Sequence, residues 1–295
     1  MSPCTQKNET YLNRSADSFF RKKAKEFAAV KKSGRTRLHD AVPITLGEEF
    51  GAYAENLRRA ARRLEDCEPA LLEIQLGGTA VGTGINAHPD YAPRAVKKLA
   101  RLTGLDPREA KNKIASQQSL GDFLAVSSAL RGLCVELNKI CNDLRLLNSG
   151  PHTGFYEIEL PAMQPDSSIM PGKVNPAMAE MVNMVCFHVI GRVRGARDVR
   201  RSRAARSQRH DAVRRLRAFR GFRRADRSAR NLPRKMRARN QGAPEICANF
   251  AERSVGQAAL LNGERGFMGA AEIAMGAIEE NKSVPETLGE KKLNK

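Results

Sequence analysis

The segment PDSSIMPGKVNPAMAEM, residues 165–181, gathers side chains that could bind a small anion and act on it. Ser167 and Ser168 supply hydroxyls, Lys173 supplies a compact positive charge with three donors, and Asn175 supplies an amide with two donors. A glycine and several prolines favour a loop here, in which these groups can converge on one ligand. From the residue types alone, an anion-binding loop and a solvated turn are alternatives of comparable weight.

The sequence predicts that long helices position this loop. Apolar residues recur every three or four positions in three runs, and each run predicts one buried helix face. The runs are Leu46, Phe50, Tyr53, Leu57, Ala60, Ala61 and Leu64; Leu130, Leu133, Cys134, Leu137, Ile140, Cys141, Leu144 and Leu147; and Met178, Met181, Val182, Val185 and Val189. Strand-like alternation is scarce. The sequence therefore predicts an all-α protein built as a bundle of long helices.

Two boundary signals accompany these runs. The motif NSGP ends the second run, because Gly150 can adopt a left-handed turn and Pro151 cannot continue a helix. The motif GLDPREAKNKIA predicts a helix start, with Asp106 as the capping residue, Pro107 in the first turn and Glu109 three residues past the cap.

The positive charge of the chain is concentrated in one segment. The net charge is +19, and residues 192–239 hold 20 basic and three acidic side chains, which leaves +2 for all the rest. Such a segment could bind nucleic acid through its phosphates, non-specifically and with strong salt dependence. Only Phe219 and Phe222 offer stacking surfaces there, and no nucleic-acid-binding motif is present. Guanidinium groups repel one another and resist burial, so we predict that residues 192–240 are disordered or form a poorly packed helix.

Cysteine usage and hydropathy indicate a cytoplasmic protein. The six cysteines form no C-x-x-C pair and have no histidine at zinc spacing, so we expect no metal site and a reducing compartment. The N-terminus lacks the apolar core of a signal peptide, and no run of about 18 apolar residues occurs, so we expect neither export nor membrane insertion.

The loop at 165–181 resembles the signature loop of the fumarase/aspartase superfamily, G-S-S-x-M-P-x-K-x-N-P. Every specified position from Ser167 to Pro176 matches, and chance agreement of that many ordered positions is very improbable. The stretches SGRTRLHDAVPITLGEEFGAY, LGGTAVGTGINAHPDY and KICNDLRLLNSGPHTGFYEIELPAMQP resemble other family regions in the same order, so the resemblance covers residues 24–191. Within the superfamily, the motifs DAVP and NPAMAEMVNMVCFHVIG are closer to the aspartate ammonia-lyase branch than to the fumarate hydratase branch.

The resemblance implies a fold, an assembly and a domain organisation. It implies a long-helix bundle of the fumarase/aspartase type, a homotetramer whose active sites combine regions of three subunits, and no organic cofactor. The family's first signature region is absent from the sequence, which predicts that the N-terminal domain is missing. The implied division is a leader at 1–20, a central helical-bundle domain with the signature loop at 21–191, the Arg-rich anomalous segment at 192–240, and the remnant of a small C-terminal helical domain at 241–295.

The resemblance also implies an activity and a set of site residues. In the aspartase branch L-aspartate loses ammonia to give fumarate, so the expected ligand is a small dicarboxylate. Ser167 would be the catalytic base, acting as an alkoxide. Lys173 and Asn175 would hold a substrate carboxylate together with Ser168, and Thr36 and Arg37 would bind substrate from a second region.

Departures from the family pattern leave alternatives open. Asp166 replaces the glycine before the serine pair, and Arg37 stands where the family usually has histidine. Family resemblance stops at residue 191 and resumes near Ala243, which suggests that residues 192–240 are read in a wrong frame. We therefore expect little or no activity from this chain. The alternative functions are fumarate hydratase, with malate as substrate, and a catalytically dead protein that binds partners through its basic segment.

Overall fold

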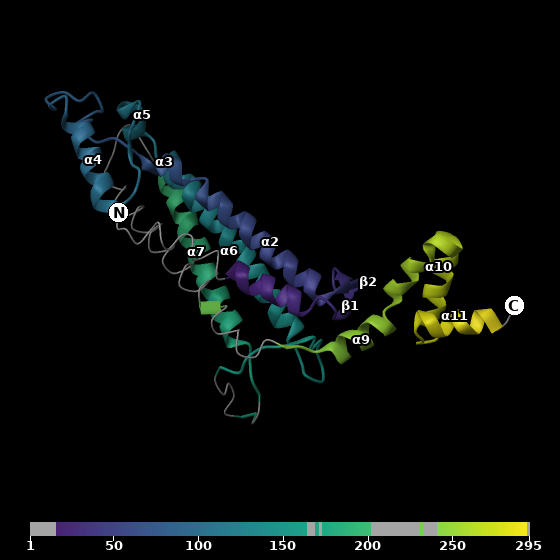
Figure 1. Ribbon diagram of the computed structural model, residues 1–295. Coiled ribbons are helices and arrows are strands. Elements are labelled where there is room, and N and C mark those ends of the chain that lie inside the picture. Colours follow the sequence, from purple (N-terminus) through teal and green to yellow (C-terminus); the bar gives the residue numbers. More distant parts are fainter. Residues whose placement is uncertain (1–15, 164–168, 171–172, 202–230, 233–240, 294–295) are drawn as a thin grey trace. The chain divides into compact units, whose positions relative to one another are not determined.

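The computed structural model describes residues 16–163, 169–170, 173–201, 231–232 and 241–293, most of them helical (Figure 1). The labelled helices are α2 Leu46–Glu65, α3 Glu68–Leu72, α4 Tyr91–Thr103, α5 Lys113–Gln118, α6 Gly121–Leu147, α7 Ala177–Arg201, α9 Pro244–Arg253, the 3-10 helix η1 Val255–Leu261, α10 Asn262–Glu279 and α11 Val284–Leu293. A further helix spans residues 16–26. The strands are short: β1 Lys31–Thr36, β2 His39–Thr45, β3 Glu73–Ile74, β4 Arg108–Glu109, β5 Ile158–Glu159 and β6 Gln241–Gly242. The all-α class predicted from the sequence is confirmed.

The chain divides into two compact units. Unit 1 comprises Met1–Ser18, Glu55–Asn142 and Ala177–Lys235, and unit 2 comprises Phe19–Ala54, Asp143–Pro176 and Met236–Lys295. The division falls within α2 and within α6.

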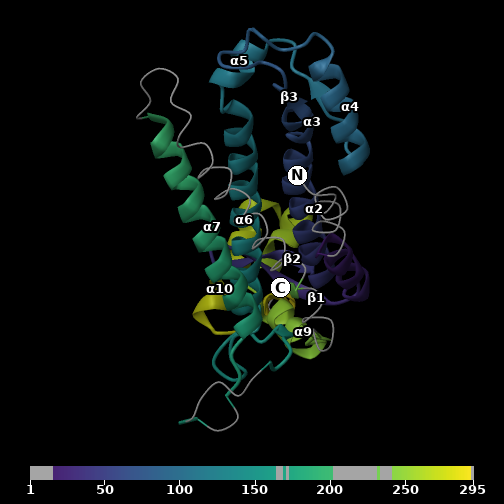
Figure 2. The ribbon, with the colours of Figure 1, turned by 90° about the vertical axis from the view of Figure 1, so that its left-hand side faces the viewer.

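The core of unit 1 includes the seam between α6 and α7, which lie side by side (Figure 2). The buried residues of this seam are Leu130, Leu133, Cys134, Leu137, Ile140 and Cys141 on α6, and Ala179, Val182, Cys186 and Val189 on α7. At one point the seam is polar, because Asn183 Nδ2 donates to Asn142 Oδ1 at 2.5 Å. The apolar stripe predicted for α6 is confirmed as a packing face, and its last members, Leu144 and Leu147, are buried in unit 2.

One predicted helix boundary is confirmed and the other is wrong. Helix α6 ends at Leu147, and Gly150 adopts the left-handed φ of 121° expected after it. No helix starts at Asp106, because the next residues form β4, which pairs with β3. Helix α5 begins later, where the extended backbone of Asn112 lets its side chain accept a hydrogen bond from Ala115 N at 3.0 Å.

In unit 2, an aromatic cluster joins the helix at 16–26 to the first half of α2. The ring of Phe50 lies 5.9 Å from Phe20, 5.2 Å from Phe27 and 5.6 Å from Tyr53. All four side chains are almost completely buried. Ring separations in this range suit tilted and edge-to-face packing, so the cluster adds specific geometry to apolar burial.

The antiparallel hairpin β1–β2 follows this helix and leads directly into α2. Arg37 and Leu38 form its two-residue turn, and a bulge shifts the register between Ser33 and Arg35. The bulge needs Gly34, because a Cβ atom there would lie 2.6 Å from the carbonyl oxygen of Val42. This hairpin was not expected from the sequence.

The C-terminal part of unit 2 is a small helical cluster. Ala258, Ile273, Ala277 and Val284 form its buried core, drawn from η1, α10 and α11. Helix α10 is kinked at Gly266, whose φ is 69°.

Most of the Arg-rich segment lies outside the described residues. Helix α7 continues through its first part to Arg201, and Asn231 and Leu232 are helical, with Leu232 fully buried. Residues 202–230 and 233–240 are not described, so disorder or poor packing there stays a prediction. Within the described ranges, no helix combines the length and apolar character needed to cross a bilayer.

A reciprocal cap starts α2 and makes its first turn sensitive to pH. Thr45 Oγ1 accepts from Glu48 N at 3.1 Å, and Thr45 N donates to Glu48 Oε2 at 2.8 Å. The Thr45 N–H and the Thr45 hydroxyl, which donates to Glu48 Oε2 at 3.0 Å, hold the pKa of Glu48 below its ordinary value. A lowered pKa means that the ionised carboxylate stabilises the folded helix, so the contribution is present above the unfolded pKa and is lost as pH falls through the folded pKa.

We therefore expect the first-turn amides of α2 to lose protection against hydrogen exchange, measured relative to the intrinsic rate at each pH, as the solution is acidified below the ordinary glutamate pKa. The variant Glu48→Gln should have the lower protection at every pH and show no such transition, whereas Glu55→Gln, further along α2, should keep it. A transition of the same size in Glu48→Gln would show that another group is responsible.

Candidate functional site

The described site residues predicted from the sequence lie on two segments of unit 2. Thr36 ends β1 and Arg37 begins the hairpin turn, and both are exposed. Exposed Lys173 and half-buried Asn175 lie in the segment before α7, where Lys173 N donates to Met170 O at 3.2 Å. Ser167 and Ser168 lie outside the described residues, as does Asp166, so their predicted roles stay predictions.

The hairpin turn that carries Arg37 is strained. Arg37 has a φ of 54° and Leu38 a φ of 67°, the left-handed values of a tight hairpin turn. Such turns strongly favour glycine and asparagine, because a Cβ atom makes this backbone region costly. Residues 36–40 are all exposed, so buried contacts do not offset the conformational cost of this turn.

Leu38→Gly should raise the free energy of unfolding by about 1 kcal/mol, because it relieves the positive φ and removes little buried surface. Chemical denaturation measures this change. Leu102→Gly is the matched control, since Leu102 is equally exposed (67% against 66%) but lies in α4. Glycine at a helical position should lower stability by about 1 kcal/mol. Destabilisation by both variants would contradict a strained tip.

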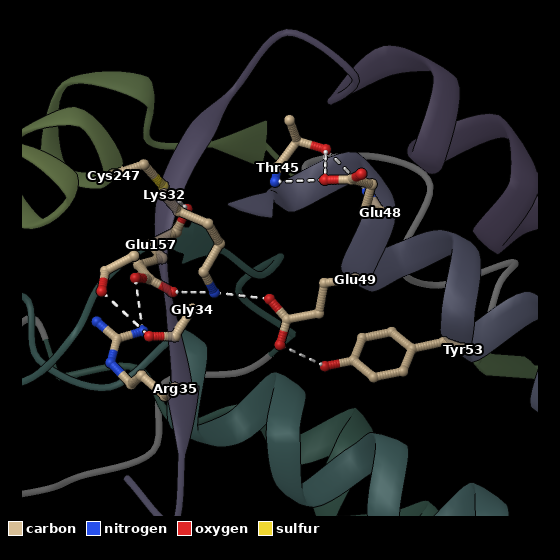
Figure 3. Close-up of polar contacts among 10 residues, drawn as sticks. Lys32, Gly34, Arg35, Thr45, Glu48, Glu49, Tyr53, Glu157 and Cys247 are labelled. Carbon is tan, nitrogen blue, oxygen red and sulfur yellow. Dashed lines mark hydrogen bonds and ion pairs between the residues drawn. The ribbon is translucent and has the colours of Figure 1, made fainter. Parts of the chain in front are cut away.

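A cluster of four charged side chains, two of them buried and two half-buried, joins β1 to α2 and to the segment after α6 (Figure 3). Lys32 Nζ contacts Glu157 Oε2 and Glu49 Oε2, each at 2.6 Å, and Arg35 NH1 contacts Glu157 Oε1 at 2.7 Å. Lys32 and Glu157 are 2% and 0% exposed. Two cations balance two carboxylates, as burial of charge requires. We call Lys32, Arg35, Glu49 and Glu157 the charge cluster.

Aromatic rings complete the environment of Arg35. Its guanidinium lies 4.1 Å from the centre of the Phe155 ring and 5.4 Å from that of Phe250. The two rings meet edge to face at 6.4 Å. A planar guanidinium suits both partners, because it can stack on a ring face while donating to a carboxylate in its plane.

Two weakly acidic groups border the charge cluster, and both stay protonated at neutral pH. Tyr53 Oη donates to Glu49 Oε1 at 3.0 Å, and burial, with the neighbouring carboxylates Glu49 and Asp143, raises the pKa of Tyr53 well above its ordinary value. Burial and the nearby Glu157 carboxylate raise the pKa of Cys247 to about 11. Its thiol contacts the Glu157 carbonyl oxygen at 3.7 Å and is a packing group rather than a nucleophile.

The base of the hairpin is also fastened to the segment that follows α9. Ser33 Oγ donates to Ser254 Oγ at 2.9 Å, and both residues are buried. Gly256 packs so closely on β2 that a Cβ atom there would lie 2.0 Å from the Ala41 carbonyl oxygen.

The charge cluster can orient other groups but carries no obvious reactive atom, since every charge faces an opposite one. The charge cluster could not be predicted from the sequence. Lys32 and Glu157 are 125 residues apart, and nothing in the motif FYEIEL distinguishes buried Glu157 from exposed Glu159. Among the described residues, no three His, Cys, Asp or Glu side chains come together as ligands for a metal.

Comparison with known proteins gives a consistent picture. A family model described as lyase matches residues 6–191. Aspartate ammonia-lyase of Helicobacter pylori is 42% identical over 274 residues, which are 93% of this chain and 58% of that protein. Aspartate ammonia-lyase of Escherichia coli is 50% identical over 172 residues, 58% of this chain and 36% of that protein. The chain thus spans little more than half the length of the first of these relatives.

Solved structures share the fold. The crystal structure of a fumarate lyase:delta crystallin from Brucella melitensis, bound to cobalt, superimposes with a TM-score of 0.92 at 39% identity and covers 97% of this chain and 62% of that one. A class II fumarase from Schistosoma mansoni also gives a TM-score of 0.92, at 27% identity, and covers 97% of this chain and 63% of that one.

Proposed function

Because this chain belongs to the lyase family, within the fumarase/aspartase superfamily, we propose that it carries the core of a carbon–nitrogen lyase that converts L-aspartate to fumarate and ammonia. One observation carries the choice of substrate: the relatives at 42–50% identity are aspartate ammonia-lyases, whereas the class II fumarase is 27% identical. The ligand is accordingly a small dicarboxylate.

The proposed chemistry distributes roles over the two segments of unit 2. Ser167, as an alkoxide, takes the proton from the carbon next to one carboxylate, which becomes a doubly negative aci-carboxylate. When this intermediate collapses, the C=C bond of fumarate forms, the C–N bond breaks and ammonia leaves. Lys173, Asn175 and Ser168 offset that charge from the signature-loop side, and Thr36 and Arg37 do so from the hairpin tip. Donors that are held in place before the charge develops give the largest catalytic contribution in such reactions. The exposure of Thr36, Arg37 and Lys173 supports this assignment, because those side chains are available to a ligand.

Two departures lead us to propose that turnover by this chain is low. Arg37 can pair with a carboxylate but cannot lose a proton, and Asp166 adds a negative charge beside a dianion site. By the same family resemblance, we propose a homotetramer whose active sites combine regions of three subunits. Its cysteine usage supports a reducing compartment, the cytoplasm.

The competing function is hydration of fumarate to malate, and the fold shared with a class II fumarase favours it as the second candidate. A binding role for the basic segment 192–240, without catalysis, is the third.

The test measures fumarate formed by the purified chain from L-aspartate and from L-malate, with Lys173→Ala as the matched variant. Calorimetry with succinate, an unreactive dicarboxylate, provides a second measurement that needs no turnover. The proposal is supported if the parent chain binds succinate, Lys173→Ala abolishes that binding, and any fumarate that forms comes from aspartate. Faster formation of fumarate from malate than from aspartate would assign fumarate hydratase activity instead. Absence of both ligand binding and turnover, together with salt-sensitive binding to random DNA, would favour the third function.

A further inference from the structure

The hairpin β1–β2 is held firmly by residues 31–35 of β1, which we call its base and which end directly before Thr36. Lys32 and Arg35 of β1 bind Glu157, and Lys32 also binds Glu49 of α2. Ser33, between these two cations, hydrogen-bonds Ser254. The base is therefore joined to three separate parts of unit 2, all by buried or largely buried groups.

The tip of the same hairpin has no comparable support. Residues 36–40 are exposed, and the turn at Arg37 and Leu38 occupies the costly left-handed region. A backbone in a sparsely populated region persists when its surroundings determine it. Since the tip is surrounded by solvent, the direction in which Thr36 and Arg37 project depends on the fixed base.

Glu157 is the point at which this base meets the other segment of the proposed site. Its backbone N–H donates to Leu147 O at 2.8 Å, and its carbonyl oxygen accepts from Ala243 N at 2.9 Å. Its two carboxylate oxygens take one cation each, Oε1 from Arg35 and Oε2 from Lys32. Ten residues further on, the chain reaches Ser167. Glu157 thus fastens the hairpin while its own backbone is held between the end of α6 and the residue before α9.

We propose that Glu157 is a positioning residue for the dicarboxylate site: its carboxylate, shared between Lys32 and Arg35, sets the direction of the hairpin tip that presents Thr36 and Arg37 to the ligand. This inference rests on the proposed function, since it takes Thr36 and Arg37 as ligand-binding groups. Glu157 itself is fully buried and touches no ligand.

A carboxylate suits this role better than an apolar side chain of similar size. Two oxygens that face two different cations define an orientation, whereas apolar packing around one side chain tolerates rotation and sliding. Buried ionic groups are retained in some proteins because they fix register rather than because they add stability. The bulge between Ser33 and Arg35 makes register important here, because it decides which side of the hairpin each cation faces.

The experiment compares Glu157→Gln and Glu157→Asp with Glu55→Gln, a control that removes a carboxylate from an exposed ion pair with Arg58. The first measurement is the affinity of the folded chain for succinate. We expect Glu157→Gln to weaken binding about tenfold, since small misplacement of binding groups is costly, while Glu157→Asp, which keeps the charge, stays within about threefold. Glu55→Gln should stay within about twofold of the parent.

The second measurement is hydrogen exchange of the backbone amides in residues 31–45, and it does not depend on any ligand. Glu157→Gln should exchange these amides about tenfold faster while the α6 amides of unit 1 keep their parent rates, and Glu157→Asp should restore most of the protection. A general structural role would instead speed exchange throughout both units.

The outcomes separate this inference from the proposed function. If the parent binds no succinate, the proposed ligand is wrong, and selective exchange of residues 31–45 with recovery in Glu157→Asp still supports positioning. A folded Glu157→Gln with the succinate affinity and hairpin exchange of Glu55→Gln would overturn the inference, as would uniformly faster exchange. If Glu157→Gln does not fold, Arg35→Lys replaces it. That variant keeps the charge but loses the planar fork, and unchanged hairpin exchange in it would overturn the inference.

Discussion

Replacing Lys32 with methionine is expected to lower the free energy of unfolding by about 3–5 kcal/mol, the range found when one partner of a buried ion pair is removed. Methionine matches lysine in length and fills the same space, so the loss is electrostatic rather than the result of a cavity. It leaves the carboxylates of Glu49 and Glu157, both of which contact Lys32 Nζ at 2.6 Å, without the cation between them. Urea denaturation followed by circular dichroism measures the change.

The same substitution at an exposed ion pair provides the control. Lys282 Nζ lies 2.8 Å from Glu280, but the two side chains are 37% and 52% exposed. Water screens such pairs, so Lys282→Met should change the free energy of unfolding by less than about 1 kcal/mol. If Lys32→Met lowered the free energy of unfolding no more than Lys282→Met does, the charge cluster would not be stabilising the hairpin base. That result would also contradict the positioning role of Glu157.

The long helices could be predicted because the residues that each helix buries repeat at helical spacing within its own sequence. In α6 the predicted stripe that runs from Leu130 to Leu147 repeats at the helical spacing and its members are all buried, whereas Val135 and Leu146, which lie off the stripe, are exposed. In α2 the stripe members from Leu46 to Ala61 are likewise buried, and Leu64 is half-buried. These patterns depend only on neighbours three or four positions away, so a single sequence is enough to reveal them.

The hairpin could not be predicted in this way, because its stability comes from distant residues. Its turn places Arg37 and Leu38 where glycine or asparagine would be the recognisable signal. The interactions that hold its strands in place join Lys32 to Glu157 across 125 residues and Ser33 to Ser254 across 221. No local pattern contains that information.

The candidate site was predictable to a similar, limited extent. The signature loop and the hairpin-tip residues are predictions from their order in the sequence and their resemblance to a family, whereas the charge cluster has no signal of that kind. A buried glutamate and an exposed one look alike in FYEIEL, and only the fold decides which of Glu157 and Glu159 enters the core. The same holds for Asp106, which has the residue type of a helix cap but is followed by β4.

Phe50→Ala is expected to lower the free energy of unfolding by about 3–5 kcal/mol, the usual cost of emptying a buried phenylalanine site. Phe50 has no exposed surface, and its ring touches the rings of Phe20, Phe27 and Tyr53, so its loss opens a cavity where the helix at 16–26 meets α2. Because Glu49 and Tyr53 lie on the same helix and join α2 to the charge cluster, the cavity should also loosen the hairpin. Thermal or urea unfolding gives the first effect, and hydrogen exchange of residues 31–45 gives the second.

The matched control for this change is Phe267→Ala. Phe267 lies on α10 and is 75% exposed, so the same truncation there removes little buried surface and should cost less than about 0.5 kcal/mol. A loss at Phe50 with unchanged exchange in the hairpin would show that the aromatic cluster and the charge cluster stabilise unit 2 independently. Faster exchange in the hairpin would show that the position of Thr36 and Arg37 depends on packing as well as on charge. In that case the double variant Lys32→Met/Phe50→Ala should lose less unfolding free energy than the sum of the two single losses, because each change releases the same hairpin base.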